Sequence, residues 1–104
     1  MAFYEQRNPD LPLNPAGTDM VVAEGAEMNV GQLTDKGFDF IRGGAAAFTA
    51  ALEGSVTGLQ WTAIQNLNAS AQGSIAAQYN YVRVKCTVAG ALDDSELKVA
   101  GKVL

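Results

Sequence analysis

The residue types that most often carry out enzymatic chemistry are scarce in this sequence. Histidine is absent and Cys86 is the single cysteine. The commonest general base, the serine–histidine nucleophile pair and the commonest metal ligand are therefore all missing. Cys86 shares an alternating apolar face with the valines at positions 82, 84 and 88, so we expect it to be a buried and unreactive thiol.

Acidic residues and glycines also fail to form a recognisable site. The adjacent carboxylates Asp93 and Asp94 fall in a predicted turn, where aspartate is common for backbone reasons, and they lack the ligand spacing of a calcium loop. Neither phosphate-binding pattern, G-x-G-x-x-G or G-x-x-x-x-G-K-[ST], occurs. The sequence therefore predicts no catalytic residue, no metal site and no cofactor, and we do not expect an enzyme.

Trp61, the single tryptophan, is the strongest candidate for ligand contact. As a core residue of a β-sandwich, with its N–H reaching a partner, it would be ordinary, and this interpretation is favoured. As an exposed platform it could stack on a sugar ring, with the nearby polar groups of Asn66 and Asn68 completing a carbohydrate site. Both interpretations stay open at this point.

A second candidate surface lies on the most regular alternating segment, residues 79–88. Its apolar positions face one way, and Tyr79, Tyr81, Arg83 and Lys85 face the other. Aromatic residues and arginine are enriched in protein interfaces, so this outward stripe is the preferred contact surface. The alternative is a solvated strand face, since tyrosine and lysine are common there.

The elements that position these residues are expected to be β-strands. Phe38 and Phe40 flank Asp39 and place two aromatic rings on one face, which we expect to be core. Alternation fails near Ile64 and Leu67, which predicts an irregularity such as a β-bulge. About seven or eight short strands, at spacings of about 8–12 residues, predict an all-β fold, an antiparallel β-sandwich of jelly-roll or immunoglobulin-like type.

The first 18 residues differ from the rest of the chain. Three prolines at positions 9, 12 and 15 favour extended or turn conformations. The apolar residues Phe3, Tyr4, Leu11 and Leu13 favour an extended arm that packs on a neighbouring subunit over a disordered tail. We therefore expect an arm over residues 1–18 and one sandwich domain over residues 19–104, as the length of 104 residues suggests.

The charge of the chain narrows the class of partner. Seven basic and eleven acidic residues give a net charge of −4, which disfavours nucleic acid. No apolar run approaches the ~20 residues of a membrane-spanning helix, so no membrane partner is expected. Residues 54–82 contain no charged side chain, and only 17% of the chain is charged. This composition suits a surface that lies against another protein.

Two segments carry a resemblance to a known class of protein. Residues 52–64 follow the pattern L-x-G-S-x-x-G-x-x-W-x-x-I, and residues 79–84 follow Y-x-Y-V-R-V. The combination resembles small β-sandwich proteins of tailed-phage virions, such as head decoration (cement) proteins and head- or tail-fibre domains. A related pattern, S-x-D-G-x-x-W, marks galactose-binding sandwiches. Thr57 stands here where those domains often carry aspartate.

The resemblance implies a structural role. We expect a capsid decoration protein that is made in the host cytoplasm and is located on the virion, at the capsid surface. There it would bind the major capsid protein and stabilise the head shell by protein–protein contacts, as a homo-oligomer (trimer or dimer). The alternatives are a carbohydrate-binding module and an accessory protein of the tail or fibre.

Overall fold

The computed structural model describes residues 3–6, by their backbone alone, and residues 19–103. Every regular element in these residues is a β-strand. The strands are β1 (Phe3–Gln6), β2 (Asp19–Met20), β3 (Ala23–Glu24), β4 (Met28–Asn29), β5 (Leu33–Ile41), β6 (Thr49–Ser55), β7 (Thr62–Asn66), β8 (Ala71–Ser74), β9 (Tyr81–Val88), β10 (Gly90–Ala91) and β11 (Glu96–Val103).

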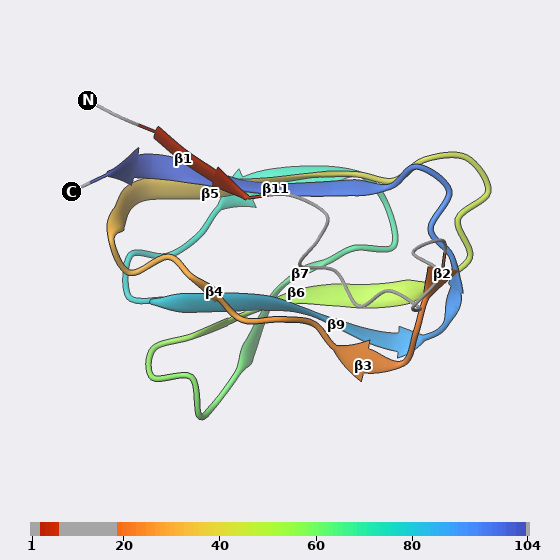
Figure 1. The fold of residues 1–104 in the computed structure, drawn as a ribbon, viewed down its shortest axis with the longest axis horizontal. Helices are drawn as coiled ribbons and strands as arrows, with labels where there is room; N and C mark the ends of the chain where they lie inside the picture. Colours follow the sequence, from red (N-terminus) through yellow and green to blue (C-terminus); the bar gives the residue numbers. More distant parts are fainter. Residues whose placement is uncertain (1–2, 7–18, 104) are drawn as a thin grey trace.

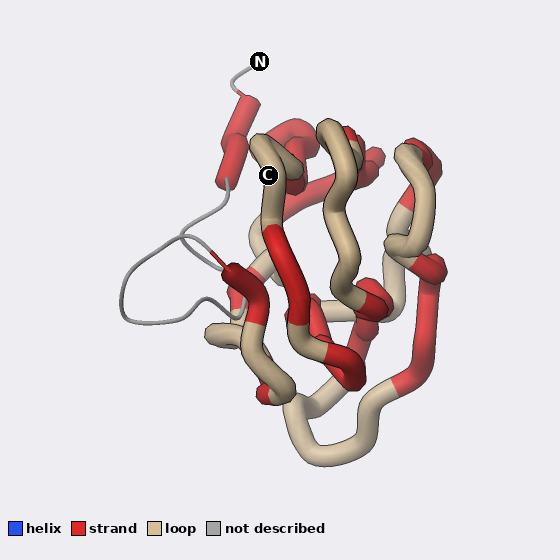
Figure 2. Tube along the Cα trace, turned by 90° about the vertical axis from the view of Figure 1, so that its right-hand side faces the viewer, coloured by secondary structure: helices blue, strands red, loops and turns tan. Residues whose placement is uncertain are grey.

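The strands form two main sheets that face each other (Figure 1). One sheet has the order β1-β11-β5-β8, and the other has the order β3-β9-β6-β7, with β4 also paired to β9. A short β10-β2 ribbon lies at one end, and all pairings are antiparallel. Figure 2 shows the two layers from the side. The predicted all-β antiparallel sandwich is therefore confirmed.

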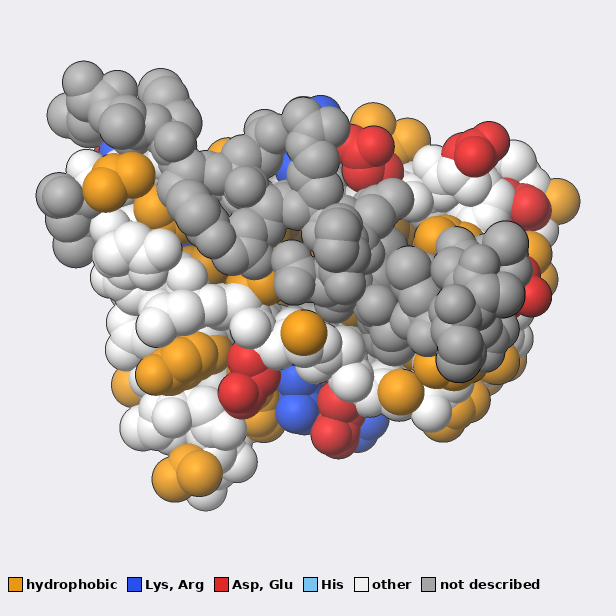
Figure 3. All heavy atoms as spheres, in the orientation of Figure 1, with side chains coloured by type: hydrophobic (Ala, Val, Ile, Leu, Met, Phe, Trp, Pro, Cys, Tyr) orange, Lys and Arg blue, Asp and Glu red, His pale blue; other side chains and the backbone are white. Residues whose placement is uncertain are grey.

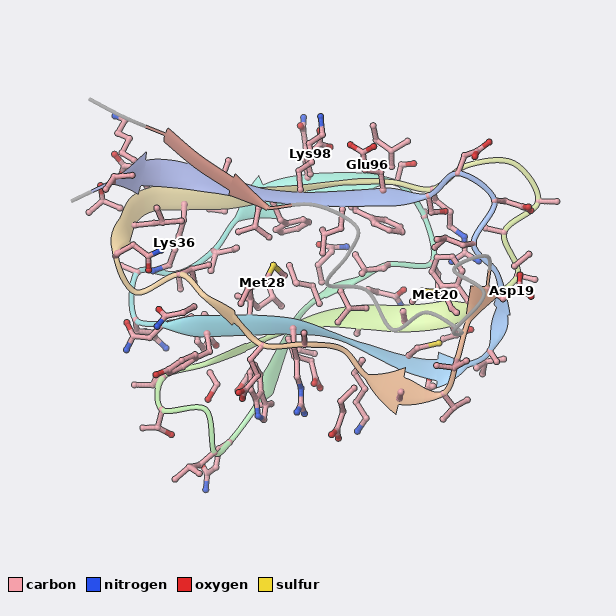
Figure 4. The ribbon with its side chains drawn as sticks, viewed as in Figure 1. Asp19, Met20, Met28, Lys36, Glu96 and Lys98 are labelled. Atoms are coloured by element: carbon pink, nitrogen blue, oxygen red, sulfur yellow. The ribbon has the colours of Figure 1, made fainter. Side chains whose placement is uncertain are left out.

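Apolar side chains from both sheets fill the space between them. Phe38 and Phe40 of β5 are buried, as their alternation predicted, and the ring of Phe40 meets that of Phe48 edge-on at 6.3 Å. Met20 and Met28 also point into this space (Figure 4). Cys86 is 2% exposed, which confirms the predicted buried thiol. Its burial raises the pKa of the thiol above the usual 9.0, because an apolar environment disfavours the thiolate.

A bulge in β5 sets which side chains enter the core. Two residues of β5, Asp35 and Lys36, face the single residue Gly101 of β11. Asp35 has a φ of 48°, in the left-handed region, which takes up the extra residue. The bulge shifts the alternation by one, so that Leu33 and Phe38 both point inward, and Lys36 points inward with them. A charged side chain is thereby brought into the sandwich.

Two predictions about strand limits can be compared with the structure. The predicted irregularity near Ile64 is confirmed, because the pairing of β6 with β7 shifts register there and passes over Ile64. The predicted strand 79–88 begins two residues later, at Tyr81. Tyr79 precedes the strand, is half-buried and packs against the core. The prediction that Tyr79 belongs to the outward face of this strand is therefore wrong.

Candidate protein-contact surface

The most prominent surface feature is the hairpin loop between β6 and β7, residues 56–61, which extends away from its sheet (Figure 1). Local hydrogen bonds define its shape. Ser55 Oγ accepts the N–H of Gly58 at 2.8 Å, and Gly58 has a φ of 86° that favours glycine. The Asn80 amide donates to the carbonyl of Val56 at 3.0 Å. The serine, glycine and asparagine therefore hold an ordered turn.

The tip of this hairpin loop is apolar. Leu59 is 86% exposed and Val56 is 49% exposed. The loop carries no charged residue, and its corner of the molecule shows apolar and uncharged atoms in Figure 3, at the lower left. An isolated exposed leucine is ordinary, but an ordered loop that presents two apolar side chains together is typical of a contact site. Sequence reasoning missed both residues, although the uncharged run S-V-T-G-L-Q with apolar residues in a turn was the available signal.

Trp61 closes the hairpin loop by stacking on Arg83 of β9. The guanidinium carbon of Arg83 lies 4.1 Å from the centre of the indole ring. Arg83 Nε also donates to Glu53 Oε1 at 2.9 Å, and Arg83 Nη1 lies 3.6 Å from Glu24 Oε2. The side chains of Arg83 and Glu53 are each 14% exposed. The loop is thus tied to the outer face of its own sheet.

Trp61 is half-buried and is not part of the hydrophobic core. The interpretation of Trp61 as a core residue is therefore wrong. The physical reason is its position: Trp61 directly precedes β7, beside a strand face whose central residue is arginine. Outside the core, a guanidinium group can cover one face of a tryptophan ring and be attracted to it by a cation–π interaction. The sequence alone does not reveal that pairing, because the two residues are distant along the chain.

The structure places three of the four residues of the predicted outward stripe on one strand face. Tyr81, Arg83 and Lys85 lie on the same face of β9, with Lys85 exposed and Tyr81 half-buried. Tyr79 instead lines a hollow of about 450 Å³ beside the hairpin loop. The other residues lining this hollow are uncharged: Val56, Thr57, Leu59, Gln60, Thr62 and Gln78. The hollow and the exposed loop tip together make one uncharged surface at this corner.

The residues considered for a sugar platform are not brought together. Asn66 lies at the opposite end of β7 from Trp61, about 16 Å away at the usual rise of a strand. Its side-chain oxygen accepts the backbone N–H of Asn68 at 2.7 Å, so it serves the local turn. Trp61, Asn66 and Asn68 therefore do not form a single site.

The predicted arm is covered only in part by the structure. The backbones of Phe3 and Tyr4 belong to β1, where they pair with Lys102 and Gly101 of β11 in the same chain. Leu11 and Leu13 lie outside the described residues.

Lys36 is the one fully buried cation among the residues that the structure describes, and it lies at one end of the sandwich (Figure 4). It is 4% exposed, and its Nζ donates to the carbonyls of Ala77 at 3.3 Å and Val30 at 3.5 Å. No ion pair of Lys36 is found within residues 19–103. Burial lowers the pKa of the amine below its usual 10.5, because the charged form loses hydration. Its bonds tie together the chain segments at that end of the sandwich.

Two further features, a metal-binding cluster and a membrane-spanning helix, were sought in the described part of the chain. Within residues 19–103 no group of three or more potential metal ligands comes together. No helix there is long and apolar enough to cross a membrane.

Searches of protein-family models, of curated proteins and of solved structures found no match to this chain. Its function must therefore be inferred from the geometry of the molecule itself.

Proposed function

We propose that this protein is a structural component of a tailed-phage virion, a decoration (cement) protein that binds the major capsid protein and has no enzymatic activity. It would be made in the host cytoplasm and act at the capsid surface. The observation that carries the proposal is the hairpin loop 56–61, which presents Leu59 at 86% exposure on an ordered support. The sequence resemblance supplies the class of particle.

The physical mechanism is burial of apolar surface at many equivalent sites. Full burial of one leucine side chain contributes about 1.5–3 kcal/mol, which is too little for stable binding by one copy. Many copies on a regular shell make each weak contact effective through multivalency. The loop loses little conformational freedom on binding, because the Trp61–Arg83 stack and the Ser55–Gly58 bond already order it.

Co-sedimentation with phage heads tests this function. Wild-type protein is expected to pellet with heads, and Leu59→Lys is expected to stay in the supernatant. Val22→Lys is the matched control, since Val22 is 66% exposed and lies near the far end of the same sheet. Failure of the wild type to bind heads, or equal loss of binding in both variants, would contradict the proposal.

A second candidate is carbohydrate binding, and the uncharged hollow beside the loop favours it. Gln60 and Gln78 supply carboxamides there, and Tyr79 supplies an aromatic ring. Neutral sugars are bound by such groups. A glycan array separates the two functions: binding of a glycan that Gln78→Ala abolishes and Val22→Lys retains would favour a sugar site, since Val22 is exposed and does not line the hollow. A tail or fibre position would use the same loop and would be distinguished by where the protein lies on the particle.

A further inference from the structure

Two sheet edges are open on the same side of the sandwich. Among the residues that the structure describes, β7 ends one sheet and pairs only with β6, while β8 ends the other sheet and pairs only with β5. Residues 67–70 connect these two strands directly. Within the described residues each strand therefore presents one row of backbone N–H and C=O groups without a partner strand. Such rows are templates for the addition of another strand.

The usual protections of an open edge are scarce on this side. Natural edge strands carry lysine, other charges, proline or bulges that block strand addition. β7 reads TAIQN and β8 reads AQGS, with no charge and no proline. The bulge at Ile64 bends β7 locally, so a strand added to this edge must follow the same bend. The far side of the same sheet differs, because β3 carries Glu24 and the segment that links β3 to β4 carries Glu27.

The side chains along these edges suit contact with an identical surface. Gln65, Asn66 and Gln72 carry carboxamides, and a carboxamide both donates and accepts hydrogen bonds. Asn66 Oδ1 and Gln65 Nε2 already make local bonds, which leaves the NH2 group of Asn66 and the side-chain oxygen of Gln65 for such a contact. Ile64 of β7 and Ala71 of β8 are half-buried against the core. They supply apolar area to a contact that would otherwise be polar.

The charge of the chain favours a second copy as the partner on this side. Each chain has a net charge of −4, so two copies repel over most relative orientations. Because residues 54–82 are uncharged, this side brings the fewest like charges together. Antiparallel pairing of a strand with its own copy is also compatible with a two-fold axis, which is the commonest symmetry of protein dimers.

We propose that two copies of this chain associate through the β7–β8 side, with β7 of one copy antiparallel to β7 of the other. Each sheet then continues across the two-fold axis, and main-chain hydrogen bonds supply the contact. Pairing centred on Ile64 places Thr62 of one copy opposite Asn66 of the other. This association does not rest on the proposed role on the capsid, because it uses the backbone edge of β7 and not the tip of the hairpin loop. The two surfaces adjoin at Thr62, which also lines the hollow beside the loop.

Sedimentation equilibrium with a charge-exchange pair tests the interface. Thr62→Glu combined with Asn66→Asp adds negative charge, and the aspartate keeps an acceptor for the Asn68 N–H. Thr62→Lys combined with Asn66→Lys adds positive charge. The wild type is expected to be a dimer, each double variant alone a monomer, and an equal mixture of the two a dimer again. Circular dichroism and thermal melting establish that each variant is folded.

Ala26→Glu on the opposite side of the sheet is the matched control and is expected to dimerise like the wild type. A wild type that stays monomeric at its highest soluble concentration overturns the proposal. So does an oligomer that survives both double variants, or a mixture that fails to dimerise. Leu59→Lys is expected to dimerise normally, which separates failure of this interface from failure of capsid binding.

Discussion

The guanidinium of Arg83 lies over the indole of Trp61, with the guanidinium carbon 4.1 Å from the ring centre. The same guanidinium holds Glu53 through a 2.9 Å bond from its Nε. One side chain therefore joins the hairpin loop to the middle two strands of its sheet. This contact orders the loop that presents Leu59, so the proposed contact surface and the stability of the sheet depend on the same residue.

Arg83→Met removes both interactions and leaves Glu53 partly buried without its cation. We expect the free energy of unfolding to fall by about 2 kcal/mol, measured by urea denaturation. The matched control is Lys98→Met, which breaks the more exposed Lys98–Glu96 pair on the outer face of the other sheet (Figure 4). That control should cost less than about 0.5 kcal/mol. Equal costs for the two variants would show that the Arg83 contacts do not stabilise the fold.

Trp61→Ala tests the finding that the tryptophan lies outside the core. It should cost about 1 kcal/mol from the lost stack, whereas Phe40→Ala should cost about 3–5 kcal/mol as a buried aromatic. Acrylamide should quench the fluorescence of this single tryptophan in the folded wild type. A loss of unfolding free energy as large as that of Phe40→Ala, together with protection of the tryptophan from quenching, would show that Trp61 is a core residue.

Lys36 gives the stability a specific dependence on pH. The pKa of Lys36 is lower in the folded state than the usual 10.5. At pH values between the folded-state pKa and 10.5, the unfolded state therefore binds more protons than the folded state. Stability from Lys36 therefore rises as the pH rises toward 10.5. The raised pKa of Cys86 acts in the opposite direction above 9.0. The Cys86 effect cancels when the wild type is compared with Lys36→Met.

The measurement is the free energy of unfolding of both proteins over this alkaline range. We expect the wild type to gain stability relative to Lys36→Met as the pH rises. A difference that stays constant with pH would mean that Lys36 titrates alike in both states.

Gly54 tests the close packing under the hairpin. A Cβ at this position would lie 2.7 Å from Ile64 Cδ1 and 2.8 Å from Tyr79 Cγ. Gly54→Ala should therefore cost about 1–3 kcal/mol from overpacking. Gly73→Ala is the comparison, because its Cβ would meet the Phe38 ring at 3.2 Å, which a small shift relieves. If Gly54→Ala proves no more costly in thermal or urea denaturation than Gly73→Ala, the placement of Tyr79 against the core is wrong.

The sequence predicts the sandwich well, because period-two alternation directly reports which side chains face the core. Phe38, Phe40 and Cys86 are buried as this alternation predicts. Lys36 could not be placed in this way, because a single bulge residue, Asp35, reverses the alternation beyond it. Bulges depend on pairing between strands that are distant in the sequence.

The proposed contact surface is harder to predict from the sequence than the fold. Arg83 belongs to the expected outward stripe, but its stack on Trp61 depends on how the hairpin loop folds over the sheet. The exposure of Leu59 depends on the same loop geometry. The run S-V-T-G-L-Q indicates a turn that contains apolar residues, but it has no periodicity. Neither the exposure of Leu59 nor its neighbours follow from that pattern.

An electron-microscopy reconstruction of the phage head that carries this protein tests the central claim most directly. The proposed function predicts density for the sandwich on the shell, with the hairpin loop 56–61 seated against the major capsid protein and Leu59 buried in the contact. A reconstruction in which the protein is absent from the shell, or in which Leu59 faces solvent while another surface meets the capsid protein, would contradict it.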